Sequence, residues 1–362
     1  MSTVTLHIGT FKTGTSYLQT VLAHAKAQLA DSGVLWPGRA WAEQVAATRA
    51  LLSNRPGRGE AWDRLVAEID AWSGPEVIIS MESLSMATPR AVARAAASLA
   101  SHQVRIVLTA RDIGRVLPAQ WQESMQNGRS WSYSDYLRGV TEGRPGDRAY
   151  DHFWGKHDWA HVLRTWSEVA ADAEVVLVTV PPSGAPRGLL WERFCQAVRL
   201  DPARYDSSRT VNESLGAASA EVLRYVSASL EGRETHKQTG RVLKKTLAKS
   251  FLNSRRSAEP TLVLPHHLEP WASTRSAELV NDLKTVPATV IGDYDDLLPR
   301  FTGPRDGETE DPSTLPVEDL LEAAGFGLAA FCEAFAENGL APRGSGPDDP
   351  TPRRAARQKN RP

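Results

Sequence analysis

Nearly continuous apolar runs alternate along the chain with segments whose apolar residues recur at helical spacing. The runs lie at 77–80, 104–110 and 175–180 and are rich in Val, Ile and Leu, a composition typical of strands buried on both faces of a parallel sheet. Between them, one helical face is marked by Trp62, Leu65, Val66, Ile69 and Trp72. The pattern predicts an α/β fold of three layers, in which helices flank a central parallel sheet and the tryptophans fill the core.

The pattern changes after residue 300. Residues 301–312 are polar and contain Gly and Pro, which predicts a linker. Residues 313–339 carry an amphipathic pattern that ends at Asn338 and Gly339, so we expect a C-terminal helical appendage. Residues 340–362 are rich in proline and basic side chains and are predicted to be disordered. We therefore expect one α/β domain over 1–300, followed by these three segments.

The composition narrows the class of protein. The chain has 362 residues, of which 41% are hydrophobic and 23% charged, and its net charge of −1 gives no sign of a nucleic-acid binder. Cys195 and Cys332 lie far apart, without metal-binding spacing or a disulfide framework. No signal peptide precedes the first strand, and no apolar run is long enough to span a membrane. These features predict a cytoplasmic protein.

The stretch 5–22 passes from an apolar strand through a loop into the start of a helix. Gly9 and Gly14 bracket the loop, and the helix is expected from Ser16 onward. Backbone N–H groups converge at the N-terminus of such a helix, and the helix dipole adds positive potential there. The stretch therefore predicts a site for a phosphate or a similar anion.

The order of residues in this loop differs from the nucleoside-triphosphate version, which has Lys directly after the second Gly. Here the order is Lys12, Thr13, Gly14, Thr15, Ser16. This order resembles the loop of sulfotransferases that use 3′-phosphoadenylyl sulfate (PAPS), and the resemblance implies a P-loop-type fold. It also implies that Lys12 lies by the oxygen that bridges sulfate and 5′-phosphate, and that the other four residues hold the 5′-phosphate. A modified P-loop kinase and a loop with only a structural role are the alternatives.

The resemblance to PAPS-dependent enzymes implies a second anion site, for the 3′-phosphate. Arg111 directly follows the strand at 104–110, as the family's arginine does, but the serine expected eight residues later is Ala119. The second contact must then come from elsewhere, and Arg115, Gln120 and Ser124 are the candidates. The family's C-terminal Arg-Lys-Gly element is absent, and the basic run 241–245 is the candidate substitute.

A base must reach the acceptor at the same place. Glu82 follows the strand at 77–80 and is the first candidate, because carboxyl ends of neighbouring parallel strands share one crevice. His157, between Lys156 and Asp158, is the second candidate. His7 lies inside the first strand and is expected to be a core residue. Sulfuryl transfer demands no metal, and we expect none.

The resulting hypothesis is a PAPS-dependent sulfotransferase that acts on a hydroxyl or amine of a small-molecule or carbohydrate acceptor. The alternatives are a kinase-like phosphotransferase that uses ATP, and a non-catalytic nucleotide-binding protein. A homodimer is possible on the evidence of the amphipathic appendage. Loops at 36–58 and 141–159 are the expected acceptor-binding segments.

Overall fold

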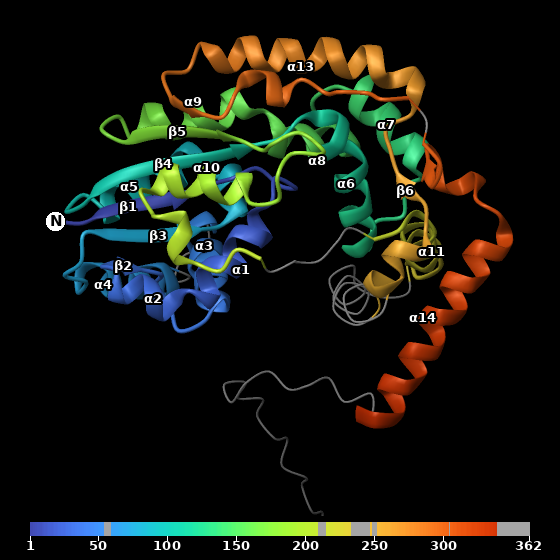
Figure 1. Ribbon diagram of the computed structural model, residues 1–362, viewed down its shortest axis with the longest axis horizontal. Coiled ribbons are helices and arrows are strands. Elements are labelled where there is room, and N and C mark those ends of the chain that lie inside the picture. Colours follow the sequence, from blue (N-terminus) through green and yellow to red (C-terminus); the bar gives the residue numbers. More distant parts are fainter. Residues whose placement is uncertain (54–58, 209–214, 233–246, 248–251, 304, 339–362) are drawn as a thin grey trace, which may run out of the picture.

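The core of the protein is a parallel sheet, whose strands β5, β4, β1, β3 and β2 lie side by side in Figure 1. The computed structural model describes residues 1–53, 59–208, 215–232, 247, 252–303 and 305–338. Within them the sheet has six strands in the order β2 (Val34–Leu35), β3 (Glu76–Ser80), β1 (Thr3–His7), β4 (Gln103–Ala110), β5 (Glu174–Thr179) and β7 (Thr289–Ile291). Every pairing between neighbouring strands is parallel.

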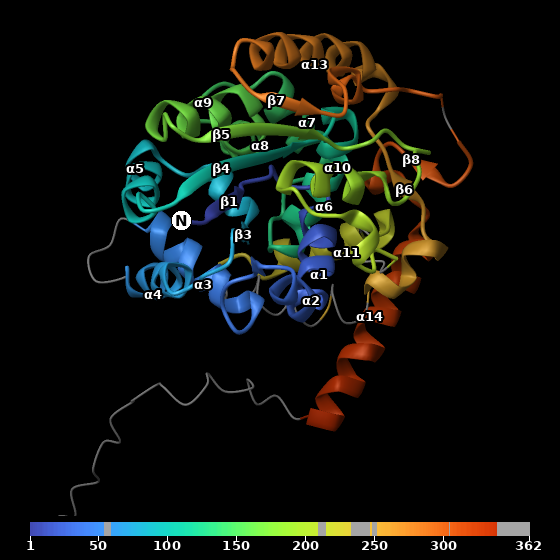
Figure 2. The ribbon, with the colours of Figure 1, turned by 60° about the vertical axis from the view of Figure 1, so that its left-hand side comes forward.

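Helices cover both faces of the sheet, as Figures 1 and 2 show. One face carries α1 (Thr15–His24), α2 (Lys26–Asp31) and α10 (Leu189–Val198). The other face carries α3 (Trp41–Leu52), α4 (Glu60–Asp70), α5 (Pro89–Ser98), α6 (Ile113–Gln126), α7 (Tyr133–Thr141), α8 (Arg148–His157), α9 (Trp159–Val169), α11 (Ala217–Ser229) and α13 (Glu269–Lys284). The three-layer α/β prediction is confirmed.

Alternation along the strands explains why both faces need cover. In β3, Val77 and Ile79 enter one core cluster and Ile78 enters the other, and all three are fully buried. A central parallel strand presents apolar side chains to both faces, so the run reads as continuous rather than alternating. Trp62 is likewise completely buried on α4, as the core interpretation of the tryptophans requires.

The segment 301–312 differs from the predicted linker. It contains the short strand β8 (Glu308–Thr309), which pairs in parallel with β6 (Thr261–Leu262). The backbone N–H of Thr261 donates to Gly307 at 2.8 Å, and that of Val263 donates to Thr309 at 2.9 Å. These bonds tie the segment to the domain. Composition alone predicted a linker because a two-residue strand carries no periodic signal.

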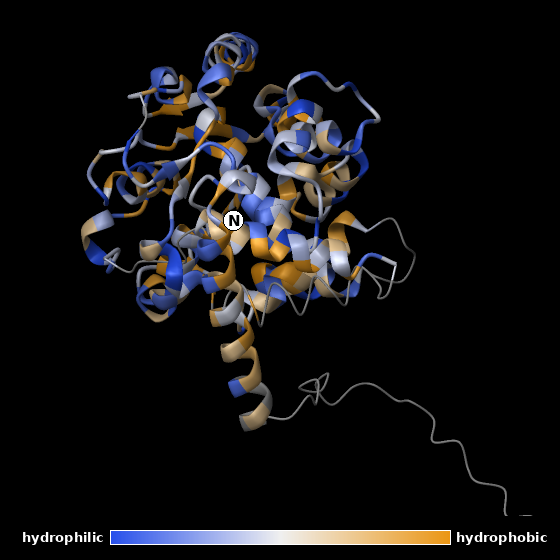
Figure 3. Cartoon of the chain, turned by 90° about the vertical axis from the view of Figure 1, so that its right-hand side faces the viewer, coloured by the Kyte–Doolittle hydropathy of each residue, from blue (hydrophilic) through white to orange (hydrophobic). Residues whose placement is uncertain are grey.

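The helix α14 (Val317–Asn338) occupies the segment interpreted as an appendage. It packs on α11 through Ala323, which forms a small cluster with Ala218 and Val222. Figure 3 shows the helix extending away from the body of the molecule. Leu321 and Leu328 are more than 60% exposed. The basic run 241–245 and the tail 340–362 lie outside the described residues. No helix in the described part of the chain is long and apolar enough to cross a membrane.

Candidate functional site

The sheet order brings three chain segments to one edge. Strands β3 and β4 lie on either side of β1. The segment after β1 contains Lys12, that after β3 contains Glu82, and that after β4 contains Arg111. Because all three strands run in the same direction, these segments leave the sheet at its carboxyl edge, where open α/β sheets bind ligands.

The loop after β1 has two residues with left-handed backbone. Gly14, at the N-cap of α1, has φ 85°, and a Cβ there would lie 2.5 Å from Leu190 Cδ2. Lys12 has φ 63° although it carries a side chain, a conformation that costs about 1–2 kcal/mol. The Nη1 group of Arg111 donates a hydrogen bond of 3.2 Å to the Lys12 carbonyl. Strained residues that their surroundings hold in place cluster at functional sites.

A buried hydrogen-bond network supports the loop from below. The hydroxyl of Thr13 donates to the Thr10 carbonyl at 2.6 Å, so the 2.7 Å bond between Thr13 and Thr109 must be donated by Thr109. His7 Nε2 then donates to Thr109 at 3.1 Å, and His7 Nδ1 accepts from the Ser80 hydroxyl at 2.7 Å. Burial lowers the pKa of His7 to about 3, so its ring is neutral, as this pattern requires. His7 is fully buried, as predicted for a core residue.

This network changes the expected role of the loop side chains. The side chain of Thr13 is fully buried and its hydroxyl is already hydrogen bonded to Thr10 and Thr109, so this hydroxyl is not available to an anion. Thr15 is 2% exposed, and its hydroxyl lies 3.4 Å from that of Thr13. Ser16 is exposed at the first turn of α1. We expected hydroxyl groups along the whole loop to hold a phosphate. Of these hydroxyls, that of Ser16 remains accessible, and the backbone N–H groups remain candidates beside it.

Gly9 is the residue that lets the network close. A Cβ at this position would lie 2.4 Å from Thr109 Oγ1 and 2.8 Å from His7 Nε2. Both neighbours are buried and hydrogen bonded. Only glycine therefore fits between the end of β1 and the network.

Two arginines at the start of α6 have incomplete hydrogen bonding. Asp112 caps the helix by accepting from the Arg115 N–H at 2.9 Å, and it also forms an ion pair with the Arg115 side chain. Arg115 Nη1 donates to the Pro181 carbonyl at 3.0 Å. Among the described residues, Arg111 Nε and Arg115 Nη2 are buried without a hydrogen-bond partner. Burial lowers the pKa of Arg111 to about 10, which leaves it cationic at neutral pH. Buried, cationic donors without partners are suited to an anion.

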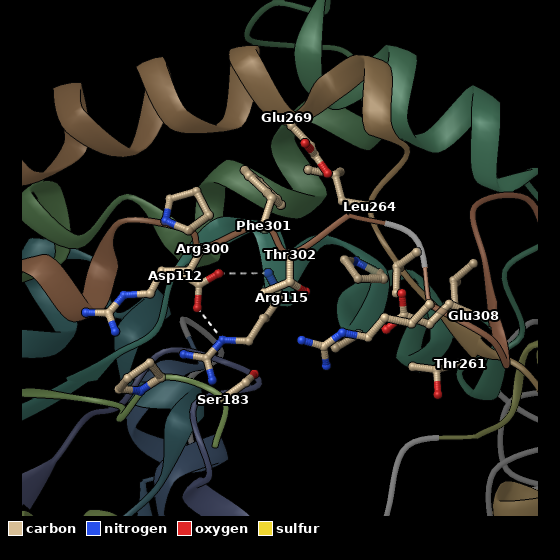
Figure 4. A pocket seen from close by; sticks show the side chains of 18 of the residues that line it. Asp112, Arg115, Ser183, Thr261, Leu264, Glu269, Arg300, Phe301, Thr302 and Glu308 are labelled. Carbon is tan, nitrogen blue, oxygen red and sulfur yellow. Dashed lines mark hydrogen bonds and ion pairs between the residues drawn. The ribbon is translucent and has the colours of Figure 1, made fainter. Parts of the chain in front are cut away.

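A pocket of about 470 Å³ lies beside these arginines. Arg111, Arg115 and Ala119 form one side, and the segment 298–303 forms another. Figure 4 shows Asp112 and Arg115 close together in this pocket, with Arg300, Phe301 and Thr302 contributed by the later segment. Three more arginines line it: Arg256, Arg300 and Arg305.

These later arginines were missed in the sequence. The basic run 241–245, expected to assist the second anion site, lies outside the described residues, whereas Arg300 and Arg305 follow β7 and line the pocket. Of the three candidates for the missing serine contact, only Arg115 lines the pocket. Gln120 and Ser124 instead contact His152 on α8, Ser124 at 2.9 Å. The sequence does hold a signal for them: Arg300 and Arg305 stand on either side of Gly303, just after the last strand of the sheet.

The side chain of Lys12 points toward α6. Its Nζ lies 3.7 Å from the Glu123 carboxylate, and both side chains are partly buried, at 23% and 17% exposure. Glu123 carried no sequence signal, because it is brought to the loop only by the packing of α6.

The two predicted bases have different surroundings. Glu82 is half-buried and begins the short helix η1 (Glu82–Met86) directly after β3. His157 is 1% exposed, its Nε2 is 3.4 Å from Gln120 Oε1, and its ring lies 4.6 Å from that of Phe153. Burial holds the pKa of His157 well below its usual value. It therefore sits within the helical layer, whereas His152, five residues earlier, is only partly buried.

No group of three or more His, Cys, Asp or Glu side chains in the described part of the chain is arranged to hold a metal ion. The arrangement instead offers a helix N-terminus, an ammonium group and several guanidinium groups. The chemistry it can perform is the binding of a polyanion and the stabilisation of negative charge.

The fold defines an α/β protein with a parallel sheet between helical layers, and cationic side chains gather at the carboxyl edge of that sheet. No family model matches the chain, and no curated protein matches it. Among solved structures, the chain is similar to a sulfotransferase from Alicyclobacillus acidocaldarius, with 14% identity and a TM-score of 0.34 over 70% of this chain and 98% of that one. Correspondence at this level transfers no residue role from one protein to the other.

Proposed function

We propose that this protein is a sulfotransferase that moves a sulfuryl group from PAPS to a hydroxyl or amine of an acceptor. The observation that carries the proposal is the position of Arg111. One of its nitrogens contacts the loop at the Lys12 carbonyl, another is buried without a partner among the described residues, and its side chain lines the neighbouring pocket. The loop and the pocket thus form two adjoining anion sites, which suits a nucleotide with phosphates on both its 5′ and 3′ sides.

The loop would hold the 5′ end of the donor. Backbone N–H groups of Gly14, Thr15 and Ser16 stand at the N-terminus of α1, where the dipole favours an anion. The Ser16 hydroxyl is exposed beside them. The ammonium group of Lys12 adds a positive charge that can stabilise the oxygen on which negative charge develops during the transfer.

The pocket would hold the 3′ end. Arg111 and Arg115 supply buried guanidinium nitrogens, and Arg300 and Arg305 add exposed ones. Phe301 offers an apolar face beside them, as a purine ring requires. In the family that the loop resembles, an arginine and a serine hold the 3′-phosphate. Here the side chain of Ala119 cannot donate a hydrogen bond, so these arginines would take the place of that pair.

PAPS supplies an activated sulfuryl group joined to a phosphate, which is a good leaving group. In the transfer, the acceptor oxygen forms a bond to sulfur while the bond from sulfur to the bridging phosphate oxygen breaks, and the electron pair stays on that phosphate. Lys12 stabilises the resulting charge. The acceptor proton goes to a carboxylate, for which Glu123 is the first choice because it lies 3.7 Å from Lys12 Nζ, and Glu82 is the second.

Calorimetry with the product nucleotide 3′-phosphoadenosine 5′-phosphate, beside ATP with Mg²⁺, tests the donor. The bisphosphate should bind more tightly than ATP with Mg²⁺. Arg111→Ala should weaken its binding about 10- to 100-fold, the value of one hydrogen bond to a charged group. Arg90→Ala is the control, because Arg90 is an exposed residue of α5. Equal or tighter binding of ATP with Mg²⁺ would contradict the proposal and favour a kinase.

Paired amide variants test the base. Glu123→Gln should lower kcat by about 10²- to 10⁴-fold on any acceptor that supports turnover, while the affinity for the bisphosphate nucleotide stays the same. If Glu82→Gln shows the larger loss, the base is Glu82. Wild-type rates in both variants would exclude a carboxylate base at this edge.

A further inference from the structure

A buried ion pair joins the segment after β7 to the end of β5. Asp296, in the short helix η6 (Tyr294–Leu297), is 7% exposed, and one of its carboxylate oxygens lies 2.7 Å from Arg193 Nη1 on α10. The hydroxyl of Thr179, the last residue of β5, donates to the same oxygen at 2.7 Å. Arg193 Nη1 also donates to the Thr179 carbonyl at 2.8 Å. Three elements that are far apart along the chain therefore meet at one carboxylate.

The backbone before this carboxylate allows the close approach. Gly292, directly after β7, has φ 102°, and a Cβ there would lie 2.0 Å from the Thr179 hydroxyl oxygen. The backbone N–H of Asp293 donates to that hydroxyl at 3.1 Å. Asp293 also caps η6, in a capping box to which the Asp296 side chain contributes. A residue with a Cβ at position 292 would hold η6 away from β5, so this connection depends on a glycine.

The chain continues from the ion pair into the segment 298–303, which forms one wall of the pocket. This wall packs closely on the backbone of α6, because a Cβ at Gly114 would lie only 3.3 Å from Phe301 Cε1. In the sequence, Gly114 stands between Arg111 and Arg115. The wall is therefore held by the ion pair on one side and packs on the turn that carries these two arginines on the other.

The ion pair is connected to Arg115 by a second route, through the end of β5. Thr179, which is bonded to both members of the pair, is followed two residues later by Pro181. The Pro181 carbonyl accepts a hydrogen bond of 3.0 Å from Arg115 Nη1. Val180 lies between them, and its N–H donates at 2.8 Å to the carbonyl of Ala110 at the end of β4. The acceptor that orients Arg115 thus belongs to a short stretch that the pair holds at its start.

From these contacts we propose that Asp296 and Arg193 are positioning residues for the anion pocket: their ion pair fixes the wall that carries Arg300 and the carbonyl that orients Arg115. The inference rests on the proposed function, because it takes the 3′-phosphate as the anion that the pocket binds. The pair acts through the pocket arginines rather than by contact with the anion. Pairing also matters electrostatically, since Asp296 lines the pocket and its charge would repel a phosphate if Arg193 did not offset it.

A graded series at position 296 tests this role by calorimetry with 3′-phosphoadenosine 5′-phosphate. Asp296→Ala should bind the nucleotide about tenfold more weakly than the wild type, because misplaced guanidinium groups lose about one hydrogen bond to a charged group. Asp296→Asn should bind with intermediate affinity, since its amide oxygen can still accept from the Thr179 hydroxyl. Glu221→Ala is the matched control: Glu221 is also buried and pairs with Arg224 on α11, and neither residue lines the pocket. This control should keep the wild-type affinity.

A double-mutant cycle separates positioning from a general loss of stability. Arg300→Ala should weaken nucleotide binding when Asp296 is present. It should have no further effect beside Asp296→Ala, because the wall that carries Arg300 is then already displaced. If Asp296→Ala only destabilised the fold, the effect of Arg300→Ala would be the same in both backgrounds.

Hydrogen exchange without any ligand distinguishes this inference from the proposed function. The N–H groups of residues 296 and 298 donate to the carbonyls of Asp293 and Asp295, at 3.1 and 3.3 Å. Both should exchange faster in Asp296→Ala than in Glu221→Ala. If the wild type does not bind the bisphosphate nucleotide although this difference is seen, the proposed function is wrong and the positioning of the wall stands.

Three results would overturn the inference: equal exchange in the two variants, wild-type nucleotide affinity in Asp296→Ala, or additive effects of the two substitutions in the cycle. If Asp296→Ala does not fold, Asp296→Asn serves in the same three comparisons.

Discussion

Replacing Lys12 by glycine should leave the protein more stable than replacing it by alanine, while both changes lower activity to the same extent. Lys12 combines two features that these substitutions separate: a backbone with φ 63° and an ammonium group 3.7 Å from Glu123. Alanine removes the ammonium and keeps the left-handed strain. Glycine removes both.

The magnitude follows from the backbone. Left-handed φ costs a residue with a Cβ about 1–2 kcal/mol, and glycine returns about 0.4–1 kcal/mol of this through the greater freedom of the unfolded chain. Lys12→Gly should therefore exceed Lys12→Ala in free energy of unfolding by about 1 kcal/mol. The ion pair with Glu123 is partly exposed and is lost in both variants, so it cancels in the comparison. Activity should fall about 10²- to 10³-fold in each, the usual effect of removing one charge-stabilising donor.

Urea unfolding of the two variants measures the difference in stability, and transfer rates measured at equal protein concentration report the loss of activity. The Arg111 hydrogen bond to the carbonyl of residue 12 is retained in both variants because it uses only the backbone. If Lys12→Gly is no more stable to unfolding than Lys12→Ala, the left-handed backbone of residue 12 is not strained. If either variant turns over at the wild-type rate, Lys12 is not part of the site.

Three other changes give separate checks. Burial lowers the pKa of His7 to about 3, so between about pH 3 and 6.5 the unfolded chain binds more protons than the folded protein, and the free energy of unfolding falls as the pH falls through this window. Between pH 7 and pH 5, the free energy of unfolding of His7→Gln, measured by urea unfolding, should change by about 2 kcal/mol less than that of the wild type. An unchanged pH dependence would refute a neutral His7. Arg105 is completely buried and forms ion pairs with two carboxylates near the amino ends of the strands. Arg105→Met should therefore lower the free energy of unfolding by about 3–5 kcal/mol, while the folded molecules keep their nucleotide affinity. A loss of affinity would show that the two ends of the sheet are coupled. Gly9→Ala places a Cβ 2.4 Å from Thr109 Oγ1, so it should cost about 1–3 kcal/mol by overpacking and weaken binding of the bisphosphate nucleotide in calorimetry; a stable variant with full affinity would mean that the network does not shape the loop.

The secondary structure of the core could be predicted from the chain because its signals are local. The runs at 77–80, 104–110 and 175–180 coincide with β3, β4 and β5 to within a residue at each end. The strand pair β6 and β8 was missed, since two residues give no periodicity. The same reason explains why 301–312 was interpreted as a linker although it forms part of the pocket wall.

In the candidate site, the residues that directly follow a strand could be predicted from the sequence, whereas those that reach the site through the packing of other segments could not. Lys12, Glu82 and Arg111 could be named from the chain, because the residue after a parallel strand must emerge at the sheet's carboxyl edge whatever packs around it. Glu123 and Arg300 could not, because their positions depend on how α6 and the segment after β7 pack on the sheet. The sequence by itself determined the three layers and the position of the loop between β1 and α1, both of which arise from short-range patterns. Only the tertiary structure decided which charges surround Lys12, since electrostatic interactions act between groups that are close in space and far apart along the chain.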